Sequence, residues 1–108
     1  MLLTPFNADS KDEKTQAFVK KYQDKFGEVP NQFAADGYDA VYAIKAAVEK
    51  AGIESSDDAD LCSKLVAAMY EITVEGVTGT MTWDETNEAV KAARAMIIHN
   101  GVAELYAE

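Results

Sequence analysis

The chain has few of the residues that carry covalent, metal or nucleic-acid chemistry. Its 108 residues include one cysteine, Cys62, and one histidine, His99. A single cysteine excludes an intrachain disulfide framework and a cysteine-based metal site. One histidine and one cysteine do not complete a Ser/His/Asp or Cys/His catalytic set, so we expect no enzyme activity. Ten Lys and Arg residues stand against nineteen Asp and Glu, for a formal net charge of −9. This charge repels phosphate backbones, so we expect no nucleic-acid binding.

Long apolar runs are absent as well. No stretch approaches the roughly 20 apolar residues that a membrane-spanning helix needs. The Met1–Phe6 segment is too short for the apolar part of a secretory signal and has no basic residue before it. The composition is otherwise globular, with 48% hydrophobic and 27% charged residues. A chain of this size forms one domain that buries roughly 60–70% of its unfolded surface, so its core is small.

The first predicted helix follows Ser10. Ser10 and Glu13 have the spacing of a capping box, in which each residue bonds to the backbone of the other. Gly27 is expected to end the helix. The apolar residues of its predicted core face recur at helical spacing: Phe18, Val19, Tyr22 and Phe26.

The second predicted helix spans Tyr38–Ala51 and stops at Gly52. Its approach is an extended segment that begins at Phe33 and turns at Gly37. The predicted core face of this helix combines large and small apolar residues: Tyr38, Ala40, Val41, Ile44, Ala47, Val48 and Ala51.

The third predicted helix begins after a cluster of polar residues over 55–58, which supply caps and negative charge at its start. The nearby Asp57, Asp58 and Asp60 are dense enough to suggest calcium. They lack the glycine and the closing glutamate of an EF-hand loop, so capping explains them better. Cys62 is expected to be a small buried or half-buried apolar residue. The predicted core face is Leu61, Leu65, Ala68, Met69 and Ile72.

Strands are predicted at both ends of the chain. Residues 2–6 favour a short strand or extended crossing segment, and 78–83 alternate as a strand does. Residues 91–98 favour a further strand, although their Ala-rich start also suits a helix. Asn100 and Gly101 fit a type I′ hairpin turn that returns residues 102–106 and leaves His99 exposed. Asn87 is expected in the left-handed conformation. The order of elements predicts an α/β fold.

Two stretches, Phe33–Ala51 and Gly76–Asp84, together closely resemble the C-terminal part of branched-chain amino-acid solute-binding proteins of ABC importers. The resemblance covers nearly all of the chain and implies a fragment without the long N-terminal portion of such proteins. The implied fold is part of a type I periplasmic-binding-protein lobe, with three helices, a small sheet and terminal crossing strands. Residues 1–7 would form a hinge or crossing strand, 8–90 a portion of one lobe, and 91–108 a crossing strand and closing hairpin.

The same resemblance implies a function. Such proteins capture a branched-chain or related amino acid outside the membrane and deliver it to a membrane permease, without a cofactor. In this family an aromatic residue at the position of Phe33 forms an apolar wall against the ligand, so Phe33 is the first candidate ligand-binding residue. Tyr38 is the second, although it suits the helix core equally well. Asp36 and Asp39 are candidate partners for the ligand ammonium, but solvated carboxylates at a helix start explain them better.

The family's polar contacts to the ligand belong mostly to earlier parts of its chain. We therefore expect this chain alone to bind leucine, isoleucine or valine weakly or not at all. An unpaired sheet edge and an apolar face also predict self-association, including exchange of terminal strands between copies. The implied location of the parent protein is extracytoplasmic, either periplasmic or cell-surface. An alternative of another class is a small acidic α/β interaction module that completes a partner's sheet and transports nothing.

Overall fold

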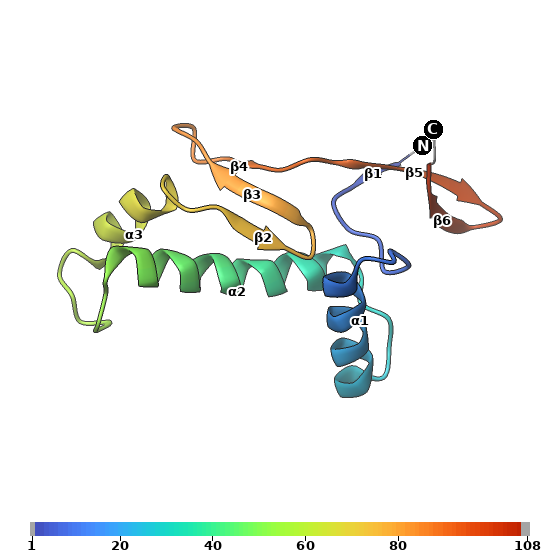
Figure 1. Cartoon of the computed structure of the whole chain (residues 1–108), viewed down its shortest axis with the longest axis horizontal. Helices are drawn as coiled ribbons and strands as arrows, with labels where there is room; N and C mark the ends of the chain where they lie inside the picture. The colour runs from blue at the N-terminus through green and yellow to red at the C-terminus, as the bar shows by residue number, and fades with distance from the viewer. Residues whose placement is uncertain (1, 107–108) are drawn as a thin grey trace.

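A long helix, α2 (Gln32–Ala51), is the axis along which the other elements are arranged (Figure 1). The structure is a computed structural model that describes residues 2–106. Helix α1 (Glu13–Phe26) crosses one end of α2, and α3 (Leu61–Met69) lies beside the other end. Helices and small antiparallel sheets together confirm the predicted α/β class.

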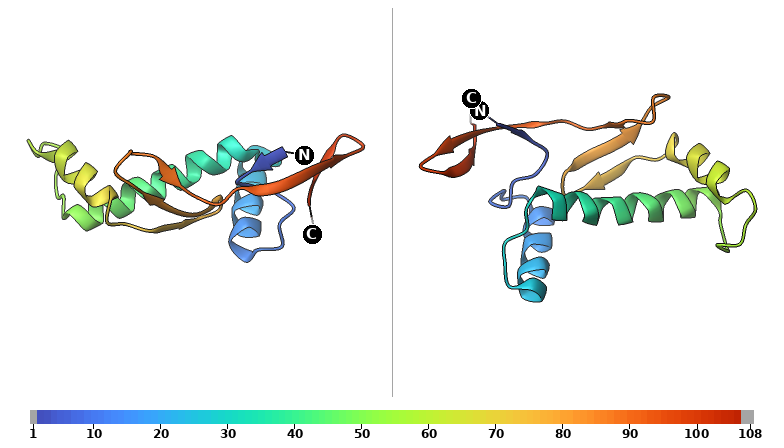
Figure 2. Two further views of the ribbon diagram at one scale, coloured as in Figure 1. Left: turned by 90° about the horizontal axis from the view of Figure 1, so that it is seen from above. Right: turned by 180° about the vertical axis from the view of Figure 1, so that it is seen from behind.

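The strands of the described residues form two antiparallel sheets. The first, in the order β2-β3-β4, lies along one side of α2 (Figure 2). Its strands are β2 (Val74–Gly76), β3 (Gly79–Trp83) and β4 (Ala89–Val90). The second, in the order β1-β5-β6, is called the terminal sheet below. Its strands are β1 (Leu2–Thr4), β5 (Arg94–His99) and β6 (Val102–Leu105). The three helices with β2, β3 and β4 are called the helical unit.

The chain is more extended than a compact domain of its length. Its radius of gyration is 16.3 Å and its extents are 53 × 32 × 20 Å. A compact chain of this size would have a radius of gyration of about 13 Å. The terminal sheet accounts for the difference, because it projects beyond the helical unit rather than packing on it (Figures 1 and 2).

The predicted capping box of the first helix is wrong by two residues. Asp12 is the N-cap, and its Oδ2 accepts hydrogen bonds from the backbone N of Thr15 at 2.9 Å and from the Thr15 hydroxyl at 3.0 Å. These two bonds, the amide first, lower the pKa of the Asp12 carboxyl. Ser10 instead accepts from the Asp12 amide. The helix ends as predicted at Gly27, which has a φ of 77°.

Helix α2 begins six residues before the predicted start. Asn31 caps it, with its side-chain oxygen accepting from the backbone N of Ala34 at 3.0 Å. Phe33 and Gly37 therefore lie inside the helix, and the extended approach predicted for them is wrong. The competing signal was the Asn31 cap, which starts the helix early enough to include a glycine that has no positive φ.

Helix α2 buries only part of the predicted face: Ala47 is buried as predicted, but Val41 and Ile44 are not. Its buried residues follow four-residue spacing and are small or polar: Ala35, Asp39, Ala43 and Ala47. Val41 and Ile44 are 66% and 60% exposed. Small side chains let β2 and β3 approach the helix closely, and this face outcompetes the larger residues opposite. We call those opposite residues the outer stripe of α2: Phe33, Gly37, Ala40, Val41, Ile44 and Val48.

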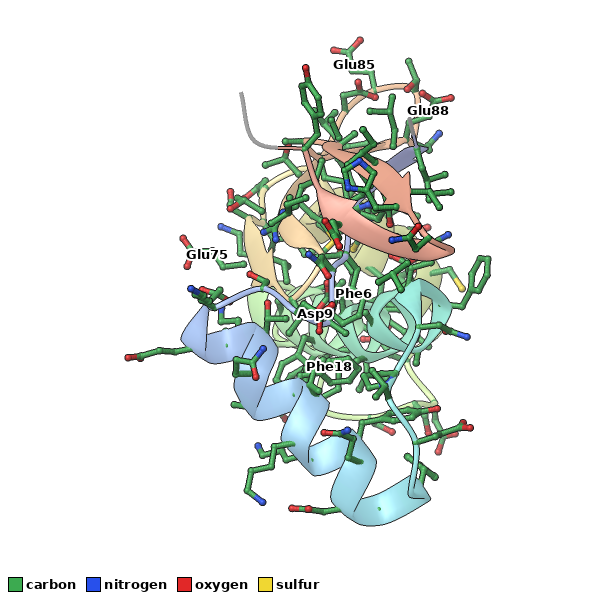
Figure 3. The ribbon with its side chains drawn as sticks, turned by 90° about the vertical axis from the view of Figure 1, so that its right-hand side faces the viewer. Phe6, Asp9, Phe18, Glu75, Glu85 and Glu88 are labelled. Atoms are coloured by element: carbon green, nitrogen blue, oxygen red, sulfur yellow. The ribbon has the colours of Figure 1, made fainter. Side chains whose placement is uncertain are left out.

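Two apolar clusters lie on either side of Asp39. One contains Ala43 and Ala47 with residues of α3, β2 and β3, among them Met81, and with Ile72 from the connection between α3 and β2. The other centres on Phe6 and Phe18, whose rings meet edge to face at 5.8 Å (Figure 3). The predicted core residue Phe26 is 58% exposed, whereas Phe18 is 4% exposed.

The C-terminal hairpin forms as predicted. Asn100 and Gly101 have φ values of 51° and 82°, and His99 pairs with Val102 across the turn. Asn87 also takes the predicted left-handed conformation, with a φ of 64°. The strand predicted from Lys91 begins at Arg94. Strand β2, which pairs with β3, was not predicted.

Helix α3 begins at Leu61, after Asp60, whose side chain makes no capping hydrogen bond. Asp58 instead accepts from the Asp60 amide and pairs with Lys64, and the Lys64 bond is the main cause of a lowered Asp58 pKa. Cys62 is exposed, so its predicted burial is wrong. Residues 2–106 contain no group of three His, Cys, Asp or Glu placed to hold a metal ion. Within residues 2–106, no helix is both long enough and apolar enough to cross a membrane.

Two glycines should respond oppositely to replacement by alanine. At Gly37, in the interior of α2, no neighbouring atom lies within 4 Å of the position that a Cβ would occupy. Gly37→Ala should therefore raise the free energy of unfolding by about 0.5–1 kcal/mol. A Cβ at Gly76 would overlap the Asp39 carboxylate, so Gly76→Ala should lower the free energy of unfolding by about 1–3 kcal/mol. Urea unfolding followed by Trp83 fluorescence measures both, and equal effects would contradict the close packing at Gly76.

Candidate functional site

A buried carboxylate joins α2 to the turn between β2 and β3. Asp39 is 2% exposed. Its Oδ1 accepts a hydrogen bond from the backbone N of Val77 at 2.8 Å, and its Oδ2 accepts from the backbone N of Thr78, also at 2.8 Å. The Thr78 hydroxyl donates to the same Oδ2 at 2.6 Å. Three donors therefore replace the water that this carboxylate loses on burial.

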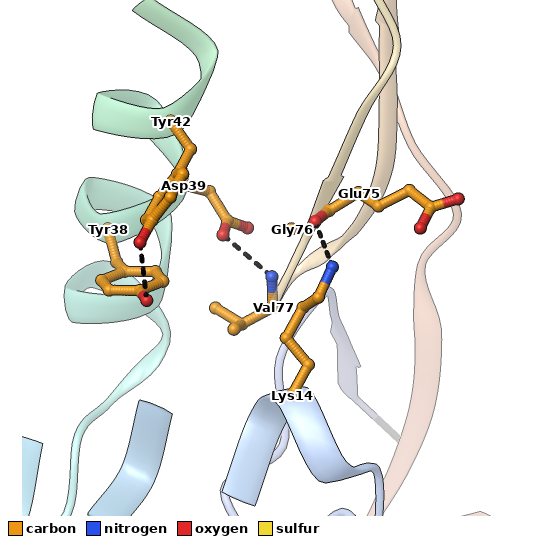
Figure 4. Close-up of a pocket in the computed structure, with 7 residues that line it drawn as sticks. All are labelled: Lys14, Tyr38, Asp39, Tyr42, Glu75, Gly76 and Val77. Carbon is orange, nitrogen blue, oxygen red and sulfur yellow. Dashed lines mark hydrogen bonds between the residues drawn. The ribbon is translucent and has the colours of Figure 1, made fainter. Parts of the chain in front are cut away.

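The Asp39 carboxylate can reach these amides because Gly76 has no side chain. The backbone of β2 approaches α2 so closely at this residue that any Cβ would collide with the carboxylate. Figure 4 shows Asp39 reaching from α2 to the Val77 amide, with Gly76 alongside. On the far side of the strand, the Lys14 ammonium donates to the Glu75 carbonyl at 2.6 Å and so ties in α1.

A small cavity of about 210 Å³ opens beside this contact. It lies where α1, α2 and β2 meet, and its walls mix aromatic rings with charged groups (Figure 4). The lining residues are Lys14, Tyr38, Asp39, Tyr42, Glu75, Gly76 and Val77. The charged groups of Lys14 and Asp39 are already engaged in hydrogen bonds, so the cavity offers few free polar groups to a ligand.

Tyr38, the second candidate ligand-binding residue, lines this cavity. Its ring packs against Phe18 at 4.7 Å and against Tyr42 at 5.0 Å, measured between ring centroids. Its hydroxyl donates to the Tyr42 hydroxyl at 3.3 Å. That hydrogen bond, followed by burial, raises the pKa of Tyr38. These contacts give Tyr38 a packing role between α1 and α2.

Phe33, the first candidate, lies elsewhere on the same helix. It is in the first turn of α2 and 73% exposed, at one end of the outer stripe. Five residues separate it from Tyr38, which places the two side chains about 140° apart around the helix axis. The structure therefore does not bring the two candidates together. An exposed aromatic ring at a helix start is available to contact a ligand or another part of a larger protein.

The two aspartates named as candidate ammonium partners differ in their contact with solvent: the Asp36 side chain is 40% exposed, whereas Asp39 is not the solvated carboxylate that we expected. Asp39 is buried as described above. Asp36 pairs with Lys91, whose Nζ lies 2.9 Å from Asp36 Oδ1. The same Nζ donates to the Thr78 hydroxyl oxygen at 3.0 Å. Asp36 and Asp39 thus belong to one polar network that includes Thr78 and Lys91.

This network was missed in the sequence, although signals for it exist. Asp39 interrupts a row of alanines at four-residue spacing, which is unusual for a residue on a solvated face. Gly76, just ahead of Val77 and Thr78, marks a close approach of the backbone. Neither signal predicts which residues Asp39 contacts, because Asp39 and Val77 are 38 residues apart in the sequence.

Fold and site together define an α/β chain in which a helical unit is joined to a second, terminal sheet. The model of the periplasmic binding protein family matches residues 1–101. This chain therefore belongs to the periplasmic binding protein family. Comparison with curated proteins gives no match.

Solved structures support this membership. A proposed branched-chain amino acid ABC transporter protein from Rhodospirillum rubrum is 33% identical and superposes with a TM-score of 0.76, over 97% of this chain and 30% of that one. The substrate-binding protein LivJ from Streptococcus pneumoniae, solved with isoleucine, is 29% identical with a TM-score of 0.73, over 94% of this chain and 28% of that one.

A third structure shows the fold alone, because its identity is 22%. It is a solute-binding protein from R. palustris in complex with benzoate, with a TM-score of 0.77 over 95% of this chain and 28% of that one. The present chain thus spans less than a third of the length of these three relatives. The relatives are solute-binding components of ABC transporters, a class of transport proteins and not of enzymes.

Removal of the Asp39 carboxylate should be costly. Asp39→Ala leaves the Val77 and Thr78 amides without their partner, and we expect a loss of about 2–4 kcal/mol in the free energy of unfolding. Asp24→Ala is the matched control, because its carboxylate is 66% exposed in an ion pair on α1. The control should change stability by less than about 0.5 kcal/mol. Similar losses for both variants, measured by urea unfolding, would show that the Asp39 contact is not central.

Proposed function

We propose that this chain is part of an extracytoplasmic solute-binding protein of an ABC importer that captures a branched-chain or related amino acid. The observation that carries the proposal is the family match over residues 1–101, together with a 33% identical relative proposed as a branched-chain amino acid transporter. In the complete protein, capture would be followed by hinge closure and delivery to a membrane permease.

Phe33 is the proposed ligand-contacting residue of this chain. A dry aromatic wall suits an aliphatic ligand side chain, because it removes apolar surface from water. The exposure of Phe33 supports this role, since its ring is not used in the core of the helical unit. Tyr38 contacts Phe18 and Tyr42 instead, so Phe33 is favoured over Tyr38 as the wall.

The division of the chain supports the proposed crossing arrangement. Strand β1 pairs with β5, with Leu2 opposite Met96 and Thr4 opposite Arg94. Residues 2–4 and 94–105 therefore meet in the terminal sheet, although about 90 residues separate β1 from β5 in the sequence. We propose that they are the crossing strands of a two-lobed protein and that 8–90 contribute to one lobe.

Weak binding to the chain can test Phe33 directly. We expect leucine to shift the amide resonances of the first turn of α2 in a nitrogen-15-labelled sample. The Kd should be no lower than about 1 mM, which corresponds to a binding free energy of about −4 kcal/mol. Phe33→Ala should abolish the shifts. Phe26→Ala removes a second exposed phenylalanine, on α1, and should leave them unchanged.

The outcome can go against the proposal in two ways. Leucine shifts that survive Phe33→Ala, or that centre on the cavity beside Asp39, would place the ligand elsewhere. Micromolar affinity would show that the chain needs no further polar contacts for the ligand. Isoleucine, valine and benzoate titrated in parallel would give the preferred class of solute.

We also propose that copies of this chain associate in solution. The terminal sheet and the outer stripe both expose large apolar side chains, including Leu3 at 64% and Ile44 at 60%. Such surfaces favour association, through packing or through exchange of β1 or β6 between copies. If the chain is instead a protein-interaction module, it would bind its partner through these same two surfaces.

Sedimentation velocity should therefore show species larger than a monomer as concentration rises. Added salt should strengthen association, because it screens repulsion between chains of net charge −9. Ile44→Asp should weaken packing through the outer stripe, whereas Val29→Asp, at an exposed apolar loop residue, should have little effect. A monomer at every concentration and salt level would refute the proposal, and a dimer unaffected by Ile44→Asp would point to strand exchange.

A further inference from the structure

Two side-chain contacts on successive turns of α2 hold the two segments that connect the terminal sheet to the helical unit. The Thr4 hydroxyl, at the end of β1, donates to Gln32 Oε1 at 2.7 Å. The Lys91 ammonium, between β4 and β5, pairs with Asp36 Oδ1 at 2.9 Å. Gln32 and Asp36 are four residues apart, so they lie one above the other on the same face of the helix.

The Lys91 contact extends into the interior of the helical unit. Lys91 Nζ also donates to the Thr78 hydroxyl oxygen at 3.0 Å, and that hydroxyl donates to Asp39. The Lys91 side chain is 24% exposed, compared with 63% for Lys45 in its ion pair with Glu49. Water and salt screen a partly buried pair less than an exposed one, so the Lys91 contact is the more persistent of the two.

The chain beyond Lys91 has no comparable restraint. Ala92 and Ala93 are exposed and belong to neither β4 nor β5. The terminal sheet begins immediately after them, where Arg94 pairs with Thr4. A connection of this kind can absorb a change in backbone direction without disturbing either sheet.

We propose that Lys91 is a positioning residue that locks the terminal sheet at a fixed angle to the helical unit. The Thr4 contact to Gln32 and the buried Phe6, two residues further on, anchor the first connection at one point, and a sheet anchored at one point can swing about it. The second contact, one helical turn away, removes this freedom. Release of Lys91 from Asp36 and Thr78 lets the sheet swing about the Thr4 contact while Ala92 and Ala93 absorb the bend. In a two-lobed solute-binding protein, which is the proposed function, this lock would set the preferred angle of opening.

The angle can be measured in the chain itself. Cys62 is the only cysteine and is exposed on α3, and His99 is exposed at the tip of β5. Nitroxide labels on Cys62 and on His99→Cys span the two parts of the molecule. Double electron–electron resonance gives the distribution of distances between them, and an excess of unlabelled chain suppresses distances between copies.

Lys91→Met keeps the length of the side chain and removes its charge, and Asp36→Asn removes the charge of its partner. We expect each to shift and broaden the distance distribution, and the double variant to broaden it no further than either alone. Lys45→Met, which removes a lysine from the exposed pair with Glu49, is the matched control and should leave the distribution as in the unaltered chain.

Unchanged distributions in both Lys91→Met and Asp36→Asn would overturn the proposal, as would equal broadening in Lys45→Met. Additive broadening in the double variant would also overturn the proposal, because it would show that Lys91 and Asp36 act independently and not through one shared contact. Amide spectra of each variant distinguish a reorientation of the two parts from unfolding of either. The measurement involves no solute, so its outcome is separate from that of the leucine titration.

Discussion

The contact between the Asp39 carboxylate and the backbone of Val77 and Thr78 is the constraint on which the helical unit depends. It lies between the two apolar clusters, to which α2 contributes only alanines among its buried residues. Contacts between alanines are not directional, whereas the Asp39 carboxylate accepts hydrogen bonds from two specific amides and so fixes the position of the β2–β3 turn. Gly76 is the matching requirement on the strand. A polar contact thus sets how the turn between β2 and β3 is placed on the alanine face of α2.

Helix α2 has two apolar faces with different consequences. The buried face carries alanines and allows close packing, while the outer stripe includes three large residues that remain exposed, Phe33, Val41 and Ile44. A helix that is apolar on opposite sides is typical of one that lies between two layers. The relatives are more than three times as long as this chain, and a second layer in a longer protein would account for the outer stripe. The same stripe is a surface through which we propose that copies of this chain associate.

Local signals in the sequence predicted the parts of the fold that depend on local chemistry. The ends of α1 and α2 at Gly27 and Gly52 and the turn at Asn100 and Gly101 each follow from residues that accept positive φ. The buried face of α2 could not be predicted in this way, because apolar residues occur on two sides and only the partner decides between them. The Asp39 contact is harder still, since its strength depends on amides that are distant in the sequence. Phe33 became a candidate through resemblance rather than through any property of its neighbours.

The first turn of α2 connects the proposed ligand contact with the orientation of the terminal sheet. Gln32 and Asp36 hold the two crossings of the chain, and Phe33 directly follows Gln32. The Asn31 cap fixes the start of this turn, so a displacement of the sheet would act on the backbone that carries Phe33. Coupling between a solute at Phe33 and the angle of the sheet therefore requires no long pathway through the protein. A rigid helical turn with contacts on two sides suffices, because a force on one side moves the other as a body.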